Sequence, residues 1–300
     1  MARTDRDAGP ARDGALHAVR RLAIATSLSD DVNLDPDAEL LLEALSDVGV
    51  DGSMCVWDDR AVNWNDFDLT VIRSTWDYTR DREGFLSWAG AIERLLNPFP
   101  IIEYSTDKHY LIDLERRSHR VVPSTFCDVG EEPAFPDGAF VVKPTVGAGS
   151  IDADKYTSAD HGRALEHVAQ LHATNRDAMI QPYVASIDDD GERALVFIDG
   201  TFSHAMTKGA MLTTPADDRD ALFRREQMSV ASAEPDAVAF AEAVLGEDFF
   251  RGILYGRVDL VKMADGWAIM ELELVEPSLF LAYDEDAPRR LAAAIRARLD

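Results

Sequence analysis

The sequence is poor in cysteine, in positive charge and in long apolar runs, and each shortage argues against a class of protein. Its two cysteines, Cys55 and Cys127, lie in separate apolar stretches, so we expect free thiols in a reducing compartment. Only 30 Lys and Arg accompany 55 Asp and Glu, and the net charge of −25 argues against nucleic acid and anionic membranes as partners. No apolar run approaches the roughly 20 residues that span a bilayer.

The N-terminus and the overall composition set the next limits. Residues 1–20 are charged and lack the apolar segment of a signal peptide, so we expect a disordered leader there. The chain is 46% hydrophobic and 28% charged, which is sufficient for a buried core. The sequence therefore predicts a cytoplasmic protein without a membrane span, and it leaves a monomer and a homodimer open.

In the first third of the chain, short apolar runs alternate with helical patterns. One helix is expected from Asp35-Pro36 to Gly49, because Pro36 suits the first helical position and Gly49 suits a left-handed cap; another is expected over 81–96. This alternation predicts an α/β domain with a parallel sheet at 21–105. Its strands are expected at 21–27, 50–57 and 68–74.

The end of the third expected strand is a candidate substrate site, because ligands bind beyond the carboxyl ends of strands in such sheets. The stretch RSTWDYT there offers a guanidinium for a substrate carboxylate and aromatic rings for a wall. Packing in the core or at a domain interface is the alternative for the aromatic residues. The predicted substrate-binding residues are Arg73, Ser74, Trp76 and Tyr78.

From residue 106 the pattern changes to one of hairpins and predicts an α+β half. A hairpin at 191–208 turns at Asp199-Gly200, which is a type I′ signal, and a second hairpin at 252–277 turns through MADGW. The polar segment 213–229 is expected to be a mobile loop. Other expected elements are a helix carrying Lys108 to Leu114 that is followed by VVPSTF (121–126) and a loop, a strand running into a glycine loop at 139–150, a helix at 159–173, a strand at 178–184, and helices at 235–246 and 286–299.

The second hairpin carries carboxylates that share one face. Glu271 and Glu273 are two residues apart on a strand, and Asp259 lies on the partner strand. Such acids repel one another unless a cation neutralises them, and an oxygen-only donor set suits Mg²⁺. The alternative is a solvated acidic strand face, which is common in a chain of this charge.

Cations that could meet an anionic ligand lie upstream of and within this hairpin. Lys143 precedes a glycine loop that can bring backbone N–H groups to a phosphate, although a surface lysine beside a turn fits equally well. Arg257 shares a strand face with Asp259. His204 is a candidate proton carrier, with a structural histidine as the alternative. Further candidate cations are Lys108, Arg193 and Lys208.

Taken in order, these motifs resemble the ATP-grasp superfamily over about residues 20–299. The resemblance rests on Lys108, VVKP with Lys143, a glycine loop, IQPYV, GER, GRVD and ELE…EP. It implies α/β plus α+β architecture, an ATP-grasp fold with an N-terminal parallel-sheet (pre-ATP-grasp) domain. The domains expected from it are a substrate-side domain at 21–105, a central ATP-binding subdomain at 106–184, and a C-terminal subdomain with the metal site at 185–300.

The resemblance also implies cofactors and residue roles. ATP and one or two Mg²⁺ ions are expected, with Asp259, Glu271 and Glu273 as metal ligands; many relatives have Asn where Glu273 stands, and Glu276 is a further candidate ligand. Arg257 resembles the arginine that faces the transferred phosphoryl group, and the expected catalytic residues are Arg257, Lys143 and His204. The expected nucleotide-binding residues are Lys108, Lys143, Gly147, Gly149, Ser150, Gln181, Tyr183, Val184, Glu192 and Arg193.

Within the superfamily, four motifs are similar to those of the D-cycloserine synthetase branch, namely RSTWDYT, TDKHYLIDL, SHAMTKGA and ELELVEPSLF. This implies that ATP activates a small amino-acid carboxylate as an acyl phosphate and that O-ureido-D-serine closes to a ring; Lys208 and Ser278 are further expected substrate contacts. Two alternatives stay open, namely a ligase that joins the carboxylate to an external amine and a nucleotide-binding module without turnover.

Overall fold

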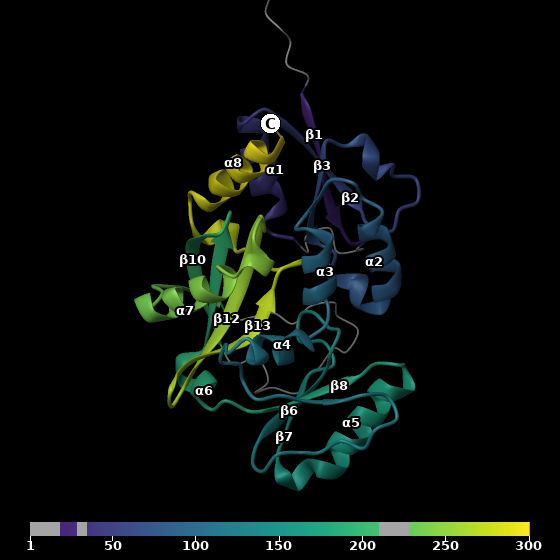
Figure 1. Cartoon of the computed structure of the whole chain (residues 1–300), viewed down its shortest axis with the longest axis vertical. Helices are drawn as coiled ribbons and strands as arrows, with labels where there is room; N and C mark the ends of the chain where they lie inside the picture. Colours follow the sequence, from purple (N-terminus) through teal and green to yellow (C-terminus); the bar gives the residue numbers. More distant parts are fainter. Residues whose placement is uncertain (1–18, 29–34, 210–227, 300) are drawn as a thin grey trace, which may run out of the picture.

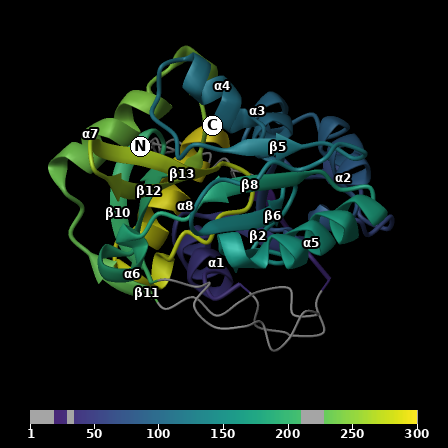
Figure 2. The same ribbon diagram turned by 90° about the horizontal axis from the view of Figure 1, so that it is seen from below.

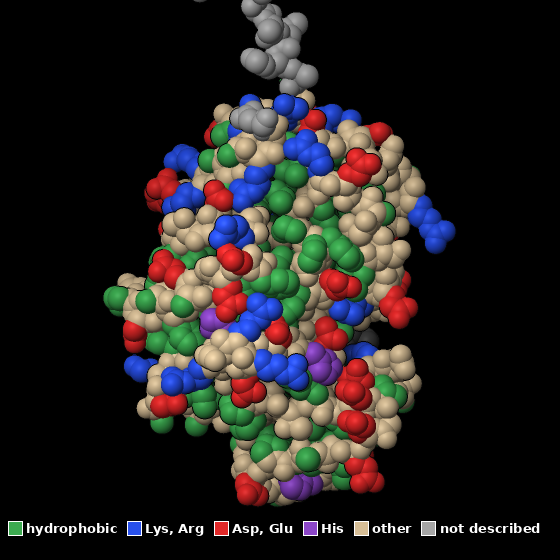
Figure 3. All heavy atoms as spheres, in the orientation of Figure 1, with side chains coloured by type: hydrophobic (Ala, Val, Ile, Leu, Met, Phe, Trp, Pro, Cys, Tyr) green, Lys and Arg blue, Asp and Glu red, His purple; other side chains and the backbone are tan. Residues whose placement is uncertain are grey.

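The computed structural model describes residues 19–28, 35–209 and 228–299 of the chain. Figure 1 shows three sheets stacked along the long axis of the molecule, each formed by a consecutive part of the sequence. Among the described helices, none is long and apolar enough to cross a membrane. Figure 3 shows acidic and basic side chains interspersed over one face, with hydrophobic atoms between them.

The N-terminal sheet is parallel and has the order β2-β1-β3-β4. The expected helix at 81–96 is wrong in its second half, because the helix ends at Gly90 and Leu95–Leu96 pairs with β3 as a fourth strand. The first strand begins at Arg20, one residue before the expected start at 21; the described chain begins at residue 19, so most of the expected leader lies outside the described residues. The elements are β1 (Arg20–Thr26), α1 (Ala38–Asp47), β2 (Val50–Val56), β3 (Leu69–Ser74), α2 (Arg82–Gly90) and β4 (Leu95–Leu96).

The central sheet is antiparallel, with the order β5-β8-β6-β7, and α5 packs on one face. Lys108 precedes a helix instead of lying on one, because the chain turns between two short helices there. After α4, Val121 forms an isolated bridge with Ile269, and the strand β5 covers Thr125–Cys127. The elements are α3 (Phe99–Ser105), α4 (Tyr110–Arg116), β5 (Thr125–Cys127), β6 (Phe140–Pro144), β7 (Asp154–Tyr156), α5 (His161–Ala173) and β8 (Ala178–Pro182).

The C-terminal sheet is antiparallel, with the order β11-β10-β9-β12-β13. Its first hairpin turns at Asp199 and Gly200, whose φ angles of 53° and 72° fit the expected type I′ turn. Most of the expected loop at 213–229 lies outside the described residues, and its last two residues begin β11. The elements are α6 (Ser186–Asp190), β9 (Glu192–Ile198), β10 (Thr201–Lys208), β11 (Met228–Ala231), α7 (Pro235–Leu245), β12 (Tyr255–Met263), β13 (Gly266–Glu273) and α8 (Ala287–Leu299).

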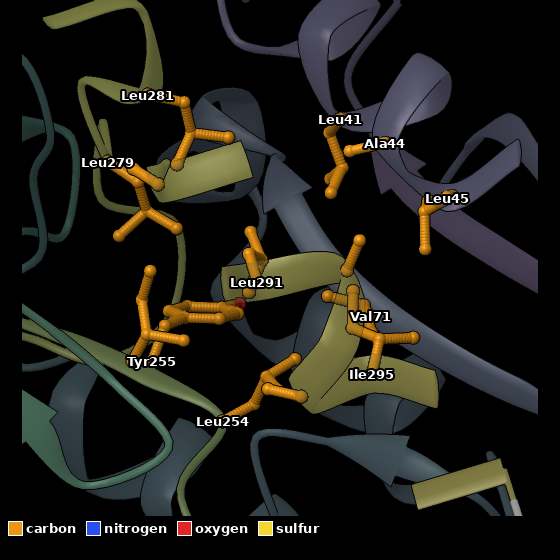
Figure 4. Packing of buried hydrophobic residues seen from close by; sticks show 14 of the residues in the cluster. Leu41, Ala44, Leu45, Val71, Leu254, Tyr255, Leu279, Leu281, Leu291 and Ile295 are labelled. Carbon is orange, nitrogen blue, oxygen red and sulfur yellow. The ribbon is translucent and has the colours of Figure 1, made fainter. Parts of the chain in front are cut away.

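A shared hydrophobic core joins the first and last parts of the chain. In Figure 4, Leu41 and Leu45 of α1 face Leu291 and Ile295 of α8, and Tyr255 lies beside them at the start of β12. Each fully buried leucine or isoleucine contributes about 1.5–3 kcal/mol relative to an exposed one. This core therefore holds the N-terminal sheet firmly against the C-terminal sheet. The central sheet lies next to β12 and β13, at the opposite end of the C-terminal sheet from α1 and α8 (Figure 1 and Figure 2).

Candidate functional site

A cavity of about 1340 Å³, its open mouth included, lies where the central sheet faces the C-terminal sheet. Strands β6, β8, β9, β12 and β13 contribute to its wall, together with the glycine loop after β6 and the turn after β3. The residues predicted from the sequence that line it are Trp76, Tyr78, Lys108, Lys143, Gly147, Gly149, Ser150, Gln181, Tyr183, Val184, Glu192, Lys208, Arg257, Glu271, Glu273 and Ser278.

The hairpin of β12 and β13 positions one arginine against two acids. Arg257 pairs in register with Glu273, and Asp259 pairs with Glu271. The guanidinium donates from Nε and Nη2 to both carboxylate oxygens of Asp259, at 2.8 and 2.9 Å, and Nη2 also donates to Glu273. Burial raises the pKa of the fully buried Asp259, but Arg257 and Lys208 outweigh burial and hold that pKa below its usual value. Asp259 therefore orients Arg257 from beneath the wall of the cavity.

Lys208 adds a second cation to the same acid. Its Nζ lies 2.8 Å from Oδ2 of Asp259 and 3.5 Å from Oε2 of Glu192, which is its register partner on β9. Burial raises the pKa of Glu192, and Lys208 opposes that shift. Arg257 and Lys208 thus share one buried carboxylate.

Two further lysines lie on the opposite side, in the central subdomain. Lys143 on β6 places its Nζ 2.6 Å from Oε1 of Glu271. Burial raises the pKa of Glu271, but Lys143 and then Lys108 outweigh it, so the carboxyl ionises well below its usual range. Lys108 donates to the carbonyl of Gly147 at 2.7 Å, and burial lowers the pKa of Lys108. Each acid of the hairpin has a Lys or Arg nitrogen as its partner.

The loop after β6 exposes backbone groups to the cavity. Gly149 and Ser150 have φ angles of 60° and 57°, in the left-handed region. A Cβ at Gly147 would meet Cγ of Pro144 at 3.0 Å, so the close approach favours glycine there. Successive backbone N–H groups in such a loop can surround a phosphate.

Strand β8, the last strand of the central sheet in the sequence, and the residues just after it form another part of the wall. The amide of Gln181 donates to Oγ of Ser124 at 3.0 Å, and the N–H of Tyr183 donates to the carbonyl of Ala139 at 2.8 Å. The Nζ of Lys155 lies 3.2 Å from the centroid of the Tyr183 ring. Because the Gln181 side chain already has a partner, a ligand at this strand would be bound mainly by backbone groups.

Arg73 and Ser74 do not reach the cavity, which differs from the substrate-binding role expected for them. Arg73 is 2% exposed, donates to the carbonyl of Pro277 at 3.1 Å and lies 3.7 Å from Oδ2 of Asp37. Its guanidinium also lies 5.3 Å from the ring centroid of Tyr255. The side chain of Ser74 forms a hydrogen bond with Thr26. These two side chains contact other segments of the chain, and only the aromatic residues after them line the cavity, so substrate binding by Arg73 and Ser74 stays a prediction that this arrangement does not favour.

Two further predicted residues lie away from the cavity wall. The His204 Nε2 lies 2.8 Å from the carbonyl of Leu279, and its Nδ1 lies 2.9 Å from Oγ of Ser203. Arg193 donates to both carboxylate oxygens of Glu234, at 3.2 and 3.1 Å. A catalytic histidine and a nucleotide-binding Arg193 are therefore not supported by this arrangement, since even spacing on a strand fixes the face but not the neighbours of that face.

Some wall residues were not singled out from the sequence. Tyr110 accepts the N–H of Leu272 at 2.8 Å, and Ser105 donates to the carbonyl of the same residue at 3.0 Å. Glu276 was considered only as an extra metal ligand, but it lies beside Tyr78 and Trp76. Their sequence signal was weak, because each contact joins segments far apart in the chain. Apolar wall residues to which the sequence assigned no role in the site are Val141, Ile187, Met270 and Leu272.

The expected metal ligands share one hairpin without forming a cluster. Among the residues that the structure describes, no group of three or more His, Cys, Asp or Glu side chains is arranged to hold a metal ion. Glu271 and Glu273 line the cavity, whereas Asp259 is completely buried and both of its oxygens contact Arg257. The three-carboxylate site therefore stays a prediction.

The arrangement of sheets matches that of solved ATP-grasp enzymes. The D-alanine–D-alanine ligase from Bacillus anthracis, complexed with ATP, superposes with a TM-score of 0.66 at 14% identity, covering 94% of this chain and 100% of that one. A RimK domain ATP-grasp protein from Sphaerobacter thermophilus gives a TM-score of 0.65 at 16% identity, with coverage of 92% and 98%. At these identities the likeness shows the fold alone, and the predicted ATP-grasp fold is confirmed.

Comparisons at higher identity define the family. Residues 22–97 match the family described as D-cycloserine synthetase DcsG, N-terminal domain. The cycloserine biosynthesis protein DcsG of Streptomyces lavendulae is 38% identical over 304 residues, covering 93% of this chain and 99% of that protein. A crystal structure of D-cycloserine synthetase DcsG superposes with a TM-score of 0.82 at 35% identity, covering 93% and 100%. The chain belongs to the D-cycloserine synthetase DcsG family of ATP-grasp ligases, as its motifs predicted.

Proposed function

We propose that this ATP-dependent ligase uses Mg²⁺ to activate the carboxylate of O-ureido-D-serine as an acyl phosphate and closes it to D-cycloserine. The similar proteins, a cycloserine biosynthesis protein and a D-cycloserine synthetase, support the product. The observation that carries the proposal is the set of paired charges in and behind one cavity wall, with Lys143 on Glu271, Lys208 on Asp259, and Arg257 on Asp259 and Glu273. Such pairs can exchange partners with a triphosphate and its counter-ion.

The lysines are proposed to bind the phosphates of ATP. Lys143 and Lys108 approach from the central subdomain and Lys208 from the C-terminal sheet, so a triphosphate between them would meet cations from both sides. The loop from Gly147 to Ser150 would add backbone N–H donors, and the strand end at Gln181 to Val184 would border the adenine. Phosphoryl transfer depends chiefly on such positioning and charge neutralisation.

The donor set of the hairpin fits Mg²⁺. Glu271 and Glu273 offer carboxylate oxygens, the hard ligands that Mg²⁺ prefers together with substrate phosphates. Asp259 can join them only when Arg257 and Lys208 turn toward the phosphates, because both cations contact its oxygens. One or two bound ions would neutralise the charge of the triphosphate.

Arg257 is proposed to stabilise the phosphoryl group as it moves to the substrate carboxylate. Its guanidinium is held by Asp259 and by the carbonyl of Ser278 at 3.2 Å, and it would turn from Asp259 toward the phosphoryl group once the triphosphate and its metal ion are bound. The oxygen-bound nitrogen of the ureido group in the same substrate molecule can then attack the activated carbonyl with the advantage of proximity, and phosphate leaves. The carbamoyl group on that nitrogen is then lost by hydrolysis as CO₂ and NH₃.

A coupled assay of ADP release tests this proposal. With Mg²⁺, ATP and O-ureido-D-serine as the single substrate, we expect ADP and D-cycloserine in equal amounts, and chelation of Mg²⁺ should stop both. Release of ADP only after an amine is added would favour a ligase that joins two molecules. Binding of ATP without ADP over a panel of small amino acids would favour a module without turnover. A cytoplasmic location and a homodimer stay predictions.

A further inference from the structure

Glu276 differs from the other glutamates of the cavity wall. Among the described residues, Glu192, Glu271 and Glu273 each form an ion pair with Lys or Arg. The carboxyl of Glu276 forms no such ion pair in the described parts of the chain, and the phenol of Tyr78, another residue of the cavity wall, is its neutral neighbour. This wall residue is thus an acid with a neutral partner.

The N-terminal domain holds the segment around Glu276 in place. The indole Nε1 of Trp76 donates to the carbonyl of Glu276 at 3.0 Å, and Arg73 donates to the carbonyl of the next residue, Pro277, at 3.1 Å. The buried carboxylate of Asp37 accepts the N–H groups of residues 279 and 281. These contacts fix where the Glu276 carboxyl enters the cavity, between two aromatic side chains and the hairpin.

The same short segment also contacts Arg257. The guanidinium donates to the carbonyl of Ser278 at 3.2 Å and to the carboxylate of Glu273, which lie on either side of Glu276 in the sequence. An α-amino acid carries its ammonium group one carbon from its carboxylate. A site for such a zwitterion therefore needs a cation and an acid in one cavity, and Arg257 and Glu276 both line this cavity.

We propose that Glu276 binds the ammonium group of the amino-acid substrate and that Tyr78 is a positioning residue for the side-chain carboxylate of Glu276. The proposal deepens the proposed function, on which it rests. Burial, together with the nearby Glu273, raises the pKa of Glu276 to about 8, opposed by Lys108. A bound ammonium group supplies the counter-charge that Glu276 lacks, and a substrate without that group cannot.

The substitution Glu276→Gln tests the charge while keeping the size of the side chain and a hydrogen-bond acceptor for Tyr78. Kinetics are measured with O-ureido-D-serine and with 3-(ureidooxy)propanoate, which lacks only the amino group. We expect the KM for O-ureido-D-serine to rise about tenfold or more. The KM for ATP and the KM for the des-amino compound should stay within about twofold. The matched control is Glu285→Gln, on an exposed residue nearby.

A second variant and an equilibrium measurement guard against a folding artefact. Tyr78→Phe should raise the KM for O-ureido-D-serine by a smaller factor, about threefold, with kcat changed less. With ADP and Mg²⁺ present, the unsubstituted protein should bind D-serine at least tenfold more tightly than D-glycerate in calorimetric titrations. This preference can hold even if O-ureido-D-serine is not turned over, so it separates this inference from the proposed function.

Two results would overturn the inference. One is an equal rise in KM for both compounds in Glu276→Gln. That result would mean that the substitution disturbs the cavity and that Glu276 does not recognise the amino group. The other is equal affinity for D-serine and D-glycerate in the unsubstituted protein.

Discussion

Two neighbouring parts of the cavity wall, the hairpin end and the end of the wall segment at Glu276, stabilise buried charge in different ways. At the hairpin end, Glu271, Glu273 and the buried Asp259 are each paired with lysine or arginine. At the other end, Glu276 lies against Tyr78 and Trp76, and its partner is a neutral phenol. The first arrangement can accept an anion together with its metal ion by exchanging partners. The second arrangement is suited to a single cation from the substrate.

The largest effect is expected when a carboxylate is removed from the hairpin end. Glu271→Gln removes a proposed Mg²⁺ ligand and the partner of Lys143, which lies 2.6 Å away. We expect a loss of kcat on the order of 10²–10³, the range for loss of one electrostatic contact to a transition state. The measurement is ADP release together with a thermal melt, which should change little because the residue lines an open cavity.

The control for that variant is Glu242→Gln, an exposed position on α7. It carries the same change in charge away from the cavity and should keep the full rate. Unchanged turnover in Glu271→Gln would remove this residue from the proposed metal site.

A lysine substitution should separate the two ends by substrate. Lys143→Met removes a proposed phosphate contact and leaves the Glu276 end intact. We expect the KM for ATP to rise about tenfold, since one charge-assisted contact is lost, while the KM for the amino acid changes little. Lys262→Met, on an exposed part of β12, is the matched control. A rise confined to the amino-acid KM would contradict the assignment of the hairpin end to the nucleotide.

Arg73 lies behind the substrate end and should act mainly on stability. Arg73→Met leaves the buried carboxylate of Asp37 without its cation and the carbonyl of Pro277 without a donor. We expect a loss of about 3 kcal/mol in the free energy of unfolding, measured by denaturant titration. The exposed Arg80→Met is the control. Unchanged stability with a large rise in the amino-acid KM would restore Arg73 to direct substrate binding.

The smallest effect concerns His204, whose pKa is lowered from 6.5 chiefly by burial. The unfolded chain takes up this proton first as the pH falls, so the free energy of unfolding should decline from about pH 6.5 downward. His204→Gln should reduce that decline, and kcat/KM should stay within about twofold because the residue does not line the cavity. Melting temperatures between pH 7.5 and 5.5 measure the first effect. A large loss of kcat/KM would show that the residue takes part in catalysis.

The sequence predicted the hairpin end well because local spacing decides it. Glu271 and Glu273 lie two apart on one strand, so the alternation of β structure already put them on one face, and the MADGW turn put Asp259 on the partner strand. The register of β12 and β13 agrees. Lys143 could be found because it precedes a glycine loop.

The structure around Glu276 could not be predicted in the same way, because contacts between segments far apart in the sequence determine it. Arg73 looked like a ligand-binding residue at a strand end, yet the segment that buries it lies about 200 residues later in the chain. The same is true of Glu276, whose neighbours Trp76 and Tyr78 come from the N-terminal domain. Likewise, helix α2 ends early because β4 pairs with β3, which a helical pattern does not reveal.

The most direct test of the partner exchange at the hairpin end is a crystal structure with Mg²⁺ and a non-hydrolysable ATP analogue. The account predicts that the contact of Lys143 with Glu271 is replaced, with Lys143 on a phosphate oxygen and Glu271 and Glu273 on the metal ion. An analogue bound in the cavity with that contact intact and the metal ion elsewhere would contradict it.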